Sequence, residues 1–240
     1  MKLISWNLNG LEDQSLDERT EAAMFEILLG APVEKAFAEG FQPNSPDIVV
    51  LQEVVERSYH AHILPHLKAA GFSVFPQQPS VRSYFEMIAV RSEHMDASYA
   101  PFEYSEQGRG LTTLKLNDLT IMTSHLESMK PGKIMRLEQA KFILEKMQTL
   151  GPCLFAGDTN LRQTEWQSLD KGKVIDAWES IGSPEKHRTT WQYENHQSRF
   201  DRAWAHQLRI QNFETFGKDK VGQLDTRASD HLGLRIEFDK

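Results

Sequence analysis

Side chains that can bind a metal ion or polarise a phosphate recur beside short apolar runs in this sequence. In chain order the candidates are Asn7, Asn9, Gln52, Glu53, His125, Glu127, Asp158, Asn160, Asp201, Asp230 and His231. Glu53, for example, follows the run Ile48–Leu51, and Asp158 follows Cys153–Ala156. Because strand ends converge in one crevice of an α/β sheet, such distant positions can form a single site.

Taken singly, each candidate has an ordinary structural explanation: Glu53 could be a solvated strand-end acid, and His231 a structural histidine. Six polar clusters that each abut an apolar run are hard to assemble by chance, which favours a functional site. The carboxylate and amide oxygens match Mg²⁺, whereas zinc prefers more histidine and cysteine. These oxygens belong to Asn9, Glu53, Asp158 and Asp230. The inventory fits phosphoryl transfer.

Other chemistries lack their motifs. The sequence contains no glycine-rich P-loop, no dinucleotide-binding glycine pattern and no Gly-x-Ser-x-Gly elbow. Cys153 is the only cysteine, so an intramolecular disulfide is excluded. Its position in an apolar run favours a buried strand residue over a nucleophile.

Apolar periodicity predicts the elements that position these residues. Strands are expected at Leu3–Trp6, Ile48–Leu51, Phe72–Phe75, Met87–Val90, Leu111–Leu116, Leu119–Thr123, Cys153–Ala156, Phe200–Trp204, Leu208–Phe213 and Leu234–Phe238. Helices are expected at Leu16–Leu29 with Ser15 as cap, at Ser58–Ala70 with a kink or fresh start at Pro65, and at Ile134–Leu150. Asn117-Asp118 predicts a hairpin turn. This order indicates mixed α/β sheets.

Size and charge limit the alternatives. The 240 residues suit one domain spanning 1–240, with no linker or repeat. The net charge of −7 argues against a protein that coats polyanions, but not against an enzyme that grips a few phosphates. The first residues carry no signal peptide, and no run is long enough to cross a bilayer. We therefore expect an intracellular, cytoplasmic monomer without a membrane partner.

At these clusters the chain resembles the endonuclease/exonuclease/phosphatase superfamily. The shared motifs are Trp6-Asn7, Gln52-Glu53, Gly157-Asp158-x-Asn160 and Ser229-Asp230-His231. Narrower motifs resemble the 5′-tyrosyl-DNA phosphodiesterases; they are Thr123–Ser128, Gly157–Arg162, Thr190-Trp191 and Arg199–Arg202. The resemblance implies a four-layer α/β sandwich, in which two mixed β-sheets pack face to face and helices flank them.

The resemblance also implies a function. It indicates a Mg²⁺-dependent phosphodiesterase, with Mn²⁺ as a possible substitute, that hydrolyses 5′-phosphotyrosyl bonds at DNA ends and leaves a 5′-phosphate. Single-stranded or frayed 5′ ends are the expected partners, and a eukaryotic member would be nuclear. The alternatives are an abasic-site endonuclease or exonuclease, a small-molecule phosphoesterase, and a catalytically silent DNA-end-binding module.

Each catalytic role is assigned through the same resemblance. Glu53, Asn9 and Asp230 are the expected metal ligands, and Asp158 would orient or deprotonate the attacking water. Asn7, Asn160 and His231 would hydrogen-bond the phosphoryl oxygens. Asp201 would pair with His231 and keep it protonated, since a neighbouring carboxylate favours the charged imidazole.

Substrate contacts are expected around this centre. The residues are Tyr84, Arg109, His125, Glu127, Arg162 and Trp191, with Arg82, Lys130, Lys133 and Arg188 as further cations. Aromatic side chains near cations can stack a base while the cations meet phosphates. His125 and Glu127 have two possible roles, shaping the DNA groove or bracing their loop.

Two positions depart from the family pattern. Asn9 stands where this group usually has aspartate, so an oxygen ligand is kept and a negative charge is lost. The stretch between Trp191 and Arg199 is short, which predicts a trimmed loop on the substrate side.

Overall fold

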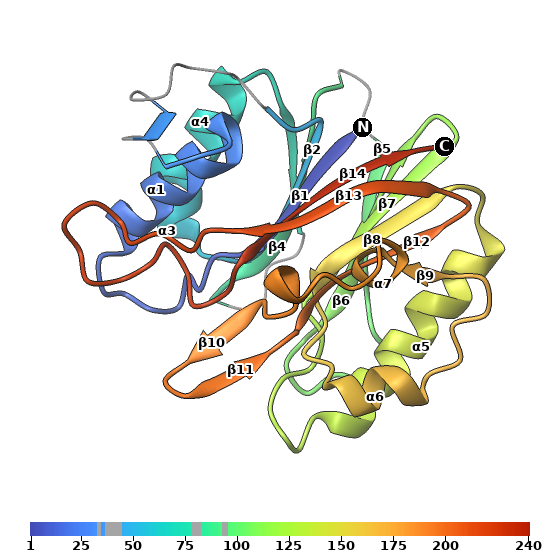
Figure 1. The fold of residues 1–240 in the computed structure, drawn as a ribbon. Helices are drawn as coiled ribbons and strands as arrows, with labels where there is room; N and C mark the ends of the chain where they lie inside the picture. Colours follow the sequence, from blue (N-terminus) through green and yellow to red (C-terminus); the bar gives the residue numbers. More distant parts are fainter. Residues whose placement is uncertain (33–34, 37–44, 78–82, 93–95) are drawn as a thin grey trace.

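The computed structural model describes residues 1–32, 35–36, 45–77, 83–92 and 96–240. Two six-stranded sheets dominate it (Figure 1). The first has the order β13-β14-β1-β2-β4-β3 and the second the order β5-β6-β7-β8-β12-β9. Pairing is parallel between β1 and β2 and between β7 and β8, and antiparallel at the other pairs, so both sheets are mixed as predicted.

The strands of the first sheet are β1 (Lys2–Asn7), β2 (Ile48–Val54), β3 (Ser73–Pro76), β4 (Phe85–Val90), β13 (Arg209–Phe216) and β14 (Gly233–Asp239). Those of the second are β5 (Asp96–Pro101), β6 (Gly110–Leu116), β7 (Leu119–Thr123), β8 (Cys153–Asp158), β9 (Ile175–Asp176) and β12 (Asp201–His206). A separate hairpin pairs β10 (Trp191–Tyr193) with β11 (His196–Ser198).

Helical segments form the outer layers. They are α1 (Leu16–Leu29), α3 (Glu56–Ser58), the π-helix η1 (Tyr59–Ile63), α4 (Leu64–Ala69), α5 (Lys133–Thr149), α6 (Gln163–Ser168), α7 (Ala177–Ser180) and the 3-10 helix η2 (Glu185–His187). In Figure 1, α1 and α4 flank the first sheet, and α5 flanks the second. Among the described residues no helix is long and apolar enough to span a membrane.

Alternate side chains on the central strands, such as β1 and β8, fill two different cores, which explains why these strands read as continuous apolar runs. On β1, Leu3 packs between the sheets, whereas Ile4 packs outward under α1. On β8, Leu154 packs between the sheets and Phe155 packs under α5. Helix, sheet, sheet and helix therefore form the four-layer sandwich that the resemblance implied.

The predicted elements occur with small shifts. All ten expected strands overlap observed ones, and the Asn117-Asp118 turn joins β6 to β7. Pro65 stands in the first turn of α4, but the helical run continues into α4 from α3 and the π-helix η1, so no fresh start is observed at the proline. Ser15 occupies the cap position of α1, but its side chain makes no capping hydrogen bond, because its backbone is left-handed with φ of 51°.

Short or exposed elements were not predicted. β5 is an edge strand with a largely exposed sequence, and β9 has only two residues. The short stretch between Trp191 and Arg199 is the β10–β11 hairpin, a compact element in place of a longer loop. Such segments carry too few apolar residues to show a period.

A buried hydrogen bond ties the two sheets together near the polar strand ends. Gln52 Nε2 on β2 donates to Thr123 Oγ1 on β7 over 3.0 Å, and both residues have no exposed surface. Thr123→Val should lower the free energy of unfolding by about 1–3 kcal/mol, because one N–H of the Gln52 amide is left unsatisfied while the other still donates to Ser5 Oγ over 3.4 Å. Denaturant unfolding measures this loss. Thr120→Val, at a half-buried position of the same strand, is the control and should change it by less than about 0.5 kcal/mol; equal effects would contradict the role of Gln52.

Candidate active site

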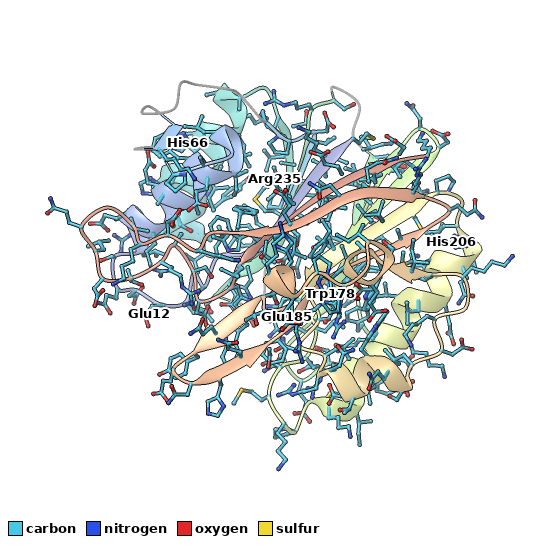
Figure 2. All side chains as sticks on the ribbon, in the orientation of Figure 1. Glu12, His66, Trp178, Glu185, His206 and Arg235 are labelled. Carbon is cyan, nitrogen blue, oxygen red and sulfur yellow. The ribbon has the colours of Figure 1, made fainter. Side chains whose placement is uncertain are left out.

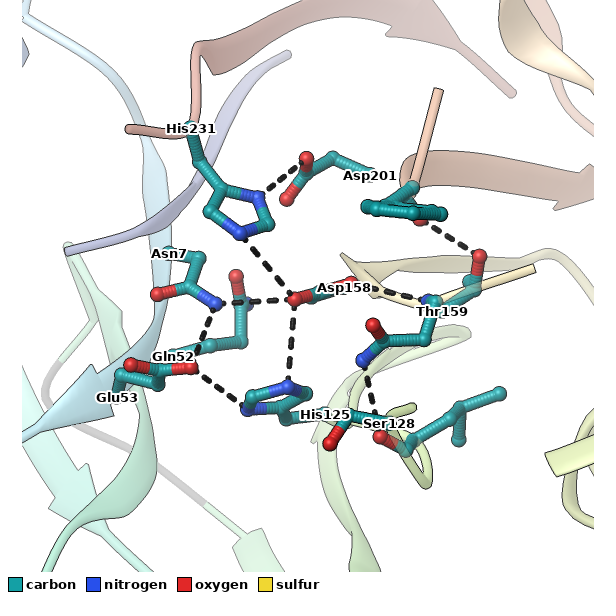
Figure 3. Close-up of polar contacts among 12 residues, drawn as sticks. Asn7, Gln52, Glu53, His125, Ser128, Asp158, Thr159, Asp201 and His231 are labelled. Atoms are coloured by element: carbon teal, nitrogen blue, oxygen red, sulfur yellow. Dashed lines mark hydrogen bonds and ion pairs between the residues drawn. The ribbon is translucent and has the colours of Figure 1, made fainter. Parts of the chain in front are cut away.

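The polar strand ends of the two sheets meet in one cluster (Figure 3). Asn7 Nδ2, at the end of β1, donates to Glu53 Oε1 on β2 over 3.2 Å. It also donates to Asp158 Oδ2, at the end of β8 in the other sheet, over 3.0 Å. The predicted convergence is therefore observed, and the Asn7 amide holds two carboxylates in place. The Asn7 amide therefore positions Glu53 and Asp158, and its expected contact with a phosphoryl oxygen stays a prediction.

His231 and Asp201 form the predicted ion pair. His231 Nδ1 donates to Asp201 Oδ2 over 2.8 Å, and His231 Nε2 lies 3.7 Å from Asp158 Oδ2. Burial alone would lower the pKa of His231, but the charges of Asp201, Asp158 and Asp230 outweigh it and raise that pKa to about 10. The imidazole is therefore cationic at neutral pH and can donate from Nε2.

The two carboxylates nearest the centre are also perturbed. Burial raises the pKa of Asp158 to about 6, with a further rise from Asp201 that His231 opposes. Burial, reinforced by the charges of Asp158 and Asp230, raises the pKa of Glu53. The two carboxylates repel each other when both are ionised, and a bound cation would offset this repulsion.

A local distortion of β2 orients Glu53. The register against β4 shifts between Leu51 and Val54, and Glu53 has a φ of 51°. Such a bulge re-aims a side chain. Gly10 lets the neighbouring loop pass: a Cβ built there would lie 2.2 Å from the Glu53 carbonyl oxygen. Asn160, with a φ of 53°, is a second site residue in this conformation, and such strain clusters at functional sites.

The cluster forms the floor of a hollow of about 580 Å³. The predicted site residues that line it are Glu53, Tyr84, Arg109, His125, Asp158, Asn160, Arg162, Trp191, Asp230 and His231. Asn160 Nδ2 also donates to the Leu126 carbonyl oxygen over 3.2 Å, which fixes its loop. Phe200, Ser198 and Met129 contribute further walls.

The two roles left open for the 124–128 loop are divided between its residues. His125 lies at the centre, with Nε2 3.3 Å from Asp158 Oδ2 and Nδ1 3.7 Å from Glu53 Oε1. Glu127 is buried and accepts hydrogen bonds from Ser105 Oγ and the Gln107 backbone. Bracing rather than substrate contact is therefore the role that the contacts of Glu127 support.

Cations and aromatic rings make up the walls. The Arg109 guanidinium lies 5.3 Å from the centre of the Tyr84 ring and donates to Gln107 Oε1 over 3.0 Å. Arg162 lies 5.3 Å from the centre of the Phe200 ring. Trp191 packs on the same Phe200 ring, with centroids 5.2 Å apart. This arrangement is suited to a stacked base and its phosphates.

Asp230 separates two hollows. Its Oδ2 accepts from Trp191 Nε1 over 2.8 Å, and the residue lines both the main hollow and a neighbouring one of about 390 Å³. Asn9 lines only the second of these, and its backbone N–H donates to Asn7 Oδ1 over 3.0 Å. Asn9 is therefore near Glu53 and Asp158 through its contact with Asn7, but it lines the hollow on the other side of Asp230.

The further cations are more peripheral. Lys130, Lys133 and Arg188 are exposed, and Arg82 lies outside the described residues. Arg188 lines a groove beside the main hollow.

One buried residue beside the site, Arg19, was not predicted from the sequence. Arg19 of α1 is buried, and its guanidinium donates to carbonyl oxygens of the loop after β1 and of Ala228, which stands two residues before Asp230. Its acceptors are the carbonyls of Leu8, Asn9, Glu12, Gln14 and Ala228. In a charged helix Arg19 looks like a solvated residue, and no side-chain pattern reveals acceptors that belong to the backbone.

Residues 4–231 match the Endonuclease/Exonuclease/phosphatase family, and the chain belongs to that family. It is also similar to individual members. Tyrosyl-DNA phosphodiesterase 2 of Bos taurus is 28% identical over 98% of this chain and 67% of that protein. The enzyme of the same name from Mus musculus is 30% identical over 98% of this chain and 60% of its own length.

A solved structure agrees with this likeness. D. rerio TDP2 complexed with single strand DNA product covers 100% of this chain and 99% of its own, with 26% identity and a TM-score of 0.79. The family and the four-layer sandwich predicted from the sequence motifs are thus confirmed.

The His231–Asp201 pair makes a pH prediction. The charge of Asp201 raises the pKa of both His231 and Asp158. Activity should fall at acid pH as Asp158 gains a proton and at alkaline pH as His231 loses one. Asp201→Asn removes this charge, so both the acid limb and the alkaline limb of the pH profile should move to lower pH. The pH dependence of kcat/KM measures the shift, with the remote Asp96→Asn as control; an alkaline limb that stays in place would contradict the assignment.

Proposed function

We propose that this protein is a Mg²⁺-dependent phosphodiesterase that hydrolyses 5′-phosphotyrosyl bonds at DNA ends and leaves a 5′-phosphate. The observation that carries the proposal is the buried His231–Asp201 pair beside Asp158 and Glu53 on the floor of one hollow. The likeness to tyrosyl-DNA phosphodiesterase 2 supplies the substrate class.

The donor set fits a hard divalent cation. Glu53, Asp158 and Asp230 line the same hollow with carboxylate oxygens, which Mg²⁺ prefers and Mn²⁺ accepts. Ligand atoms of Asp158, Asp201 and His231 also lie within 4.8 Å of one another. However, His231 is protonated and bonded to Asp201, so we assign the ion to the Glu53 side. A bound cation supplies charge neutralisation at a non-bridging phosphate oxygen and at the leaving oxygen.

The remaining steps belong to side chains of this chain. Asp158, with a pKa of about 6, is ionised at neutral pH and still basic enough to orient or deprotonate the attacking water. Cationic His231 donates from Nε2 to a phosphoryl oxygen as charge develops on it. A tyrosyl leaving group, with a free pKa of about 10, departs as a phenolate and needs little help from an acid.

A second groove supports a single strand as the partner. This groove, of about 720 Å³, shares Arg162 and Ser198 with the main hollow. Its lining includes Arg162, Arg188 and Arg199. Arg199 is buried in an ion pair with Asp176 and Arg188 pairs with Glu185, so Arg162 and the exposed Arg188 are the cations that a strand would meet. Phosphates beyond the reacting one would meet cations there. We place this reaction inside the cell, in the nucleus if the chain is eukaryotic.

The missing charge at residue 9 predicts weak Mg²⁺ binding, and hence a high Mg²⁺ concentration for half the maximal rate. Asn9→Asp restores a carboxylate near Asp230, so a lower Mg²⁺ concentration should give half the maximal rate. Titrating Mg²⁺ against turnover measures this concentration. Gln14→Glu, which adds the same charge to the wall of the neighbouring hollow, is the control. An unchanged or higher requirement in Asn9→Asp would show that residue 9 does not act on the ion.

Substrate choice is tested with one panel of oligonucleotides. It contains 5′-phosphotyrosyl, 3′-phosphotyrosyl and internal abasic substrates, each with Mg²⁺ and with a chelator. We expect Mg²⁺-dependent release of tyrosine from the 5′ adduct, faster on single-stranded or frayed ends, with Glu53→Gln inactive. Incision at the abasic site without 5′ cleavage would instead identify a repair nuclease of the same fold.

A further inference from the structure

The guanidinium of Arg19, on α1, spends all of its N–H groups on backbone carbonyl oxygens. The residue is buried, with 2% of its surface exposed. Nε donates to the carbonyl of Gln14 over 3.0 Å, Nη1 to those of Ala228 over 3.0 Å and Leu8 over 3.4 Å, and Nη2 to those of Asn9 and Glu12. A guanidinium has five N–H donors, and here each of them has an acceptor.

These acceptors come from two segments that are far apart in the sequence. Four of them lie in the loop between β1 and α1, which contains Glu12, labelled in Figure 2. The fifth belongs to Ala228, which stands 209 residues beyond Arg19. The first segment follows Asn7 directly, and the second leads into Asp230. Arg19 therefore holds two segments of the catalytic centre at one fixed separation.

The loop between β1 and α1 depends on such support. Asn9 and Ser15 have φ values of 48° and 51°, in the left-handed region. Residues other than glycine keep this conformation only where the surrounding contacts enforce it. Two of the carbonyls that Arg19 holds belong to Asn9 itself and to Gln14, the neighbour of Ser15. Without the guanidinium, the loop would lose the contacts that fix this backbone.

Asp230 lies within the electrostatic reach of the same guanidinium. Both residues line the hollow of about 390 Å³. Burial lowers the pKa of Arg19, and the charges of Glu12 and Asp230 oppose that change. On its other side, Asp230 Oδ2 accepts from Trp191 Nε1 over 2.8 Å. The position of this carboxylate therefore depends on the segment that Arg19 anchors and on the Trp191 indole.

Lysine cannot make the same set of contacts. A guanidinium offers five donors in a planar fork, whereas an ammonium has three donors and no fork. Arg19→Lys would keep the positive charge near Asp230 and leave at least two of the five carbonyls without their donor. This substitution therefore separates the geometry that arginine imposes from its charge.

We propose that Arg19 is a positioning residue that fixes the Asp230 carboxylate and thereby sets the affinity of the catalytic centre for its divalent cation. The effect on the ion rests on the proposed function, in which Asp230 helps to bind it; the placement of Asp230 does not. Loss of a group that orients a metal ligand commonly weakens metal binding by about 10- to 100-fold.

The nuclear magnetic resonance signal of the Trp191 indole N–H reports the position of Asp230 without metal or substrate. Trp191→Phe assigns this signal, and Asp230→Ala shows where it lies once the acceptor is lost. In Arg19→Lys the signal should shift toward the Asp230→Ala position. Arg235→Lys is the matched control, because Arg235 on β14 (Figure 2) is also buried and donates to a backbone carbonyl, that of Gly30. In this control the Trp191 signal should stay in place.

Binding of Mn²⁺, followed by the electron paramagnetic resonance of the free ion, tests the affinity. Arg19→Lys should weaken Mn²⁺ binding about 10-fold or more, and Arg235→Lys should bind as wild type does. Added to Asp230→Ala, Arg19→Lys should cause little further loss, because it acts through Asp230. No Mn²⁺ binding by the wild type would contradict the proposed function, while the Trp191 signal would still decide whether Arg19 positions Asp230.

An unchanged Trp191 signal together with unchanged Mn²⁺ affinity in Arg19→Lys would overturn the proposal, even if the melting temperature falls. Equal losses of affinity with and without the Asp230 carboxylate would also contradict it. Should Arg19→Lys not fold, the wild type decides. Added Mg²⁺ should then shift the Arg19 Nε–H and Trp191 indole signals with one midpoint, and an Arg19 signal that does not move would overturn the proposal.

Discussion

The buried carboxylate of Asp158 is the group on which the rest of the site depends. It ends β8 in one sheet, accepts from Asn7 at the end of β1 in the other, and lies 3.3 Å from His125. An isolated buried charge of this kind is costly. The cationic His231, itself held by Asp201, compensates that cost. The contacts of Asp158 therefore both hold the ends of the two sheets together and place the groups that the proposed reaction needs.

Backbone geometry supplies the precision that this charge arrangement needs. Glu53 and Asn160 both have positive φ, and Glu53 stands at a register shift in β2. A Cβ at Gly157 would lie 2.2 Å from the Ser124 carbonyl oxygen, so β8 approaches the His125 loop as closely as only glycine allows. Arg19 joins the loop after β1 to the loop that carries Asp230 through backbone carbonyls.

The apolar runs predicted the central strands well because those strands are buried on both faces, as Leu3 and Ile4 of β1 illustrate. The site was also predictable from motifs such as Gln52-Glu53, since strand ends converge. The hydrogen-bond partners of individual side chains were not predictable from the motifs. The Asn7 amide donates to two carboxylates, and Glu127 accepts hydrogen bonds within its own surroundings and braces its loop. These contacts depend on which donors and acceptors lie close together in the folded protein, and the spacing of residues along the chain does not show that. The β10–β11 hairpin was missed because its strands are short and exposed.

The central claim is that residues from both sheets act as one unit, with Asp158 on the second sheet and His231 leading into β14 of the first. A double-mutant cycle on turnover of the 5′-phosphotyrosyl oligonucleotide tests it most directly. Asp158→Asn and His231→Gln should each reduce kcat by on the order of 10²-fold or more. The double variant should fall far short of the product of the two losses, because either change disables the shared step. Fully multiplicative losses would contradict the account.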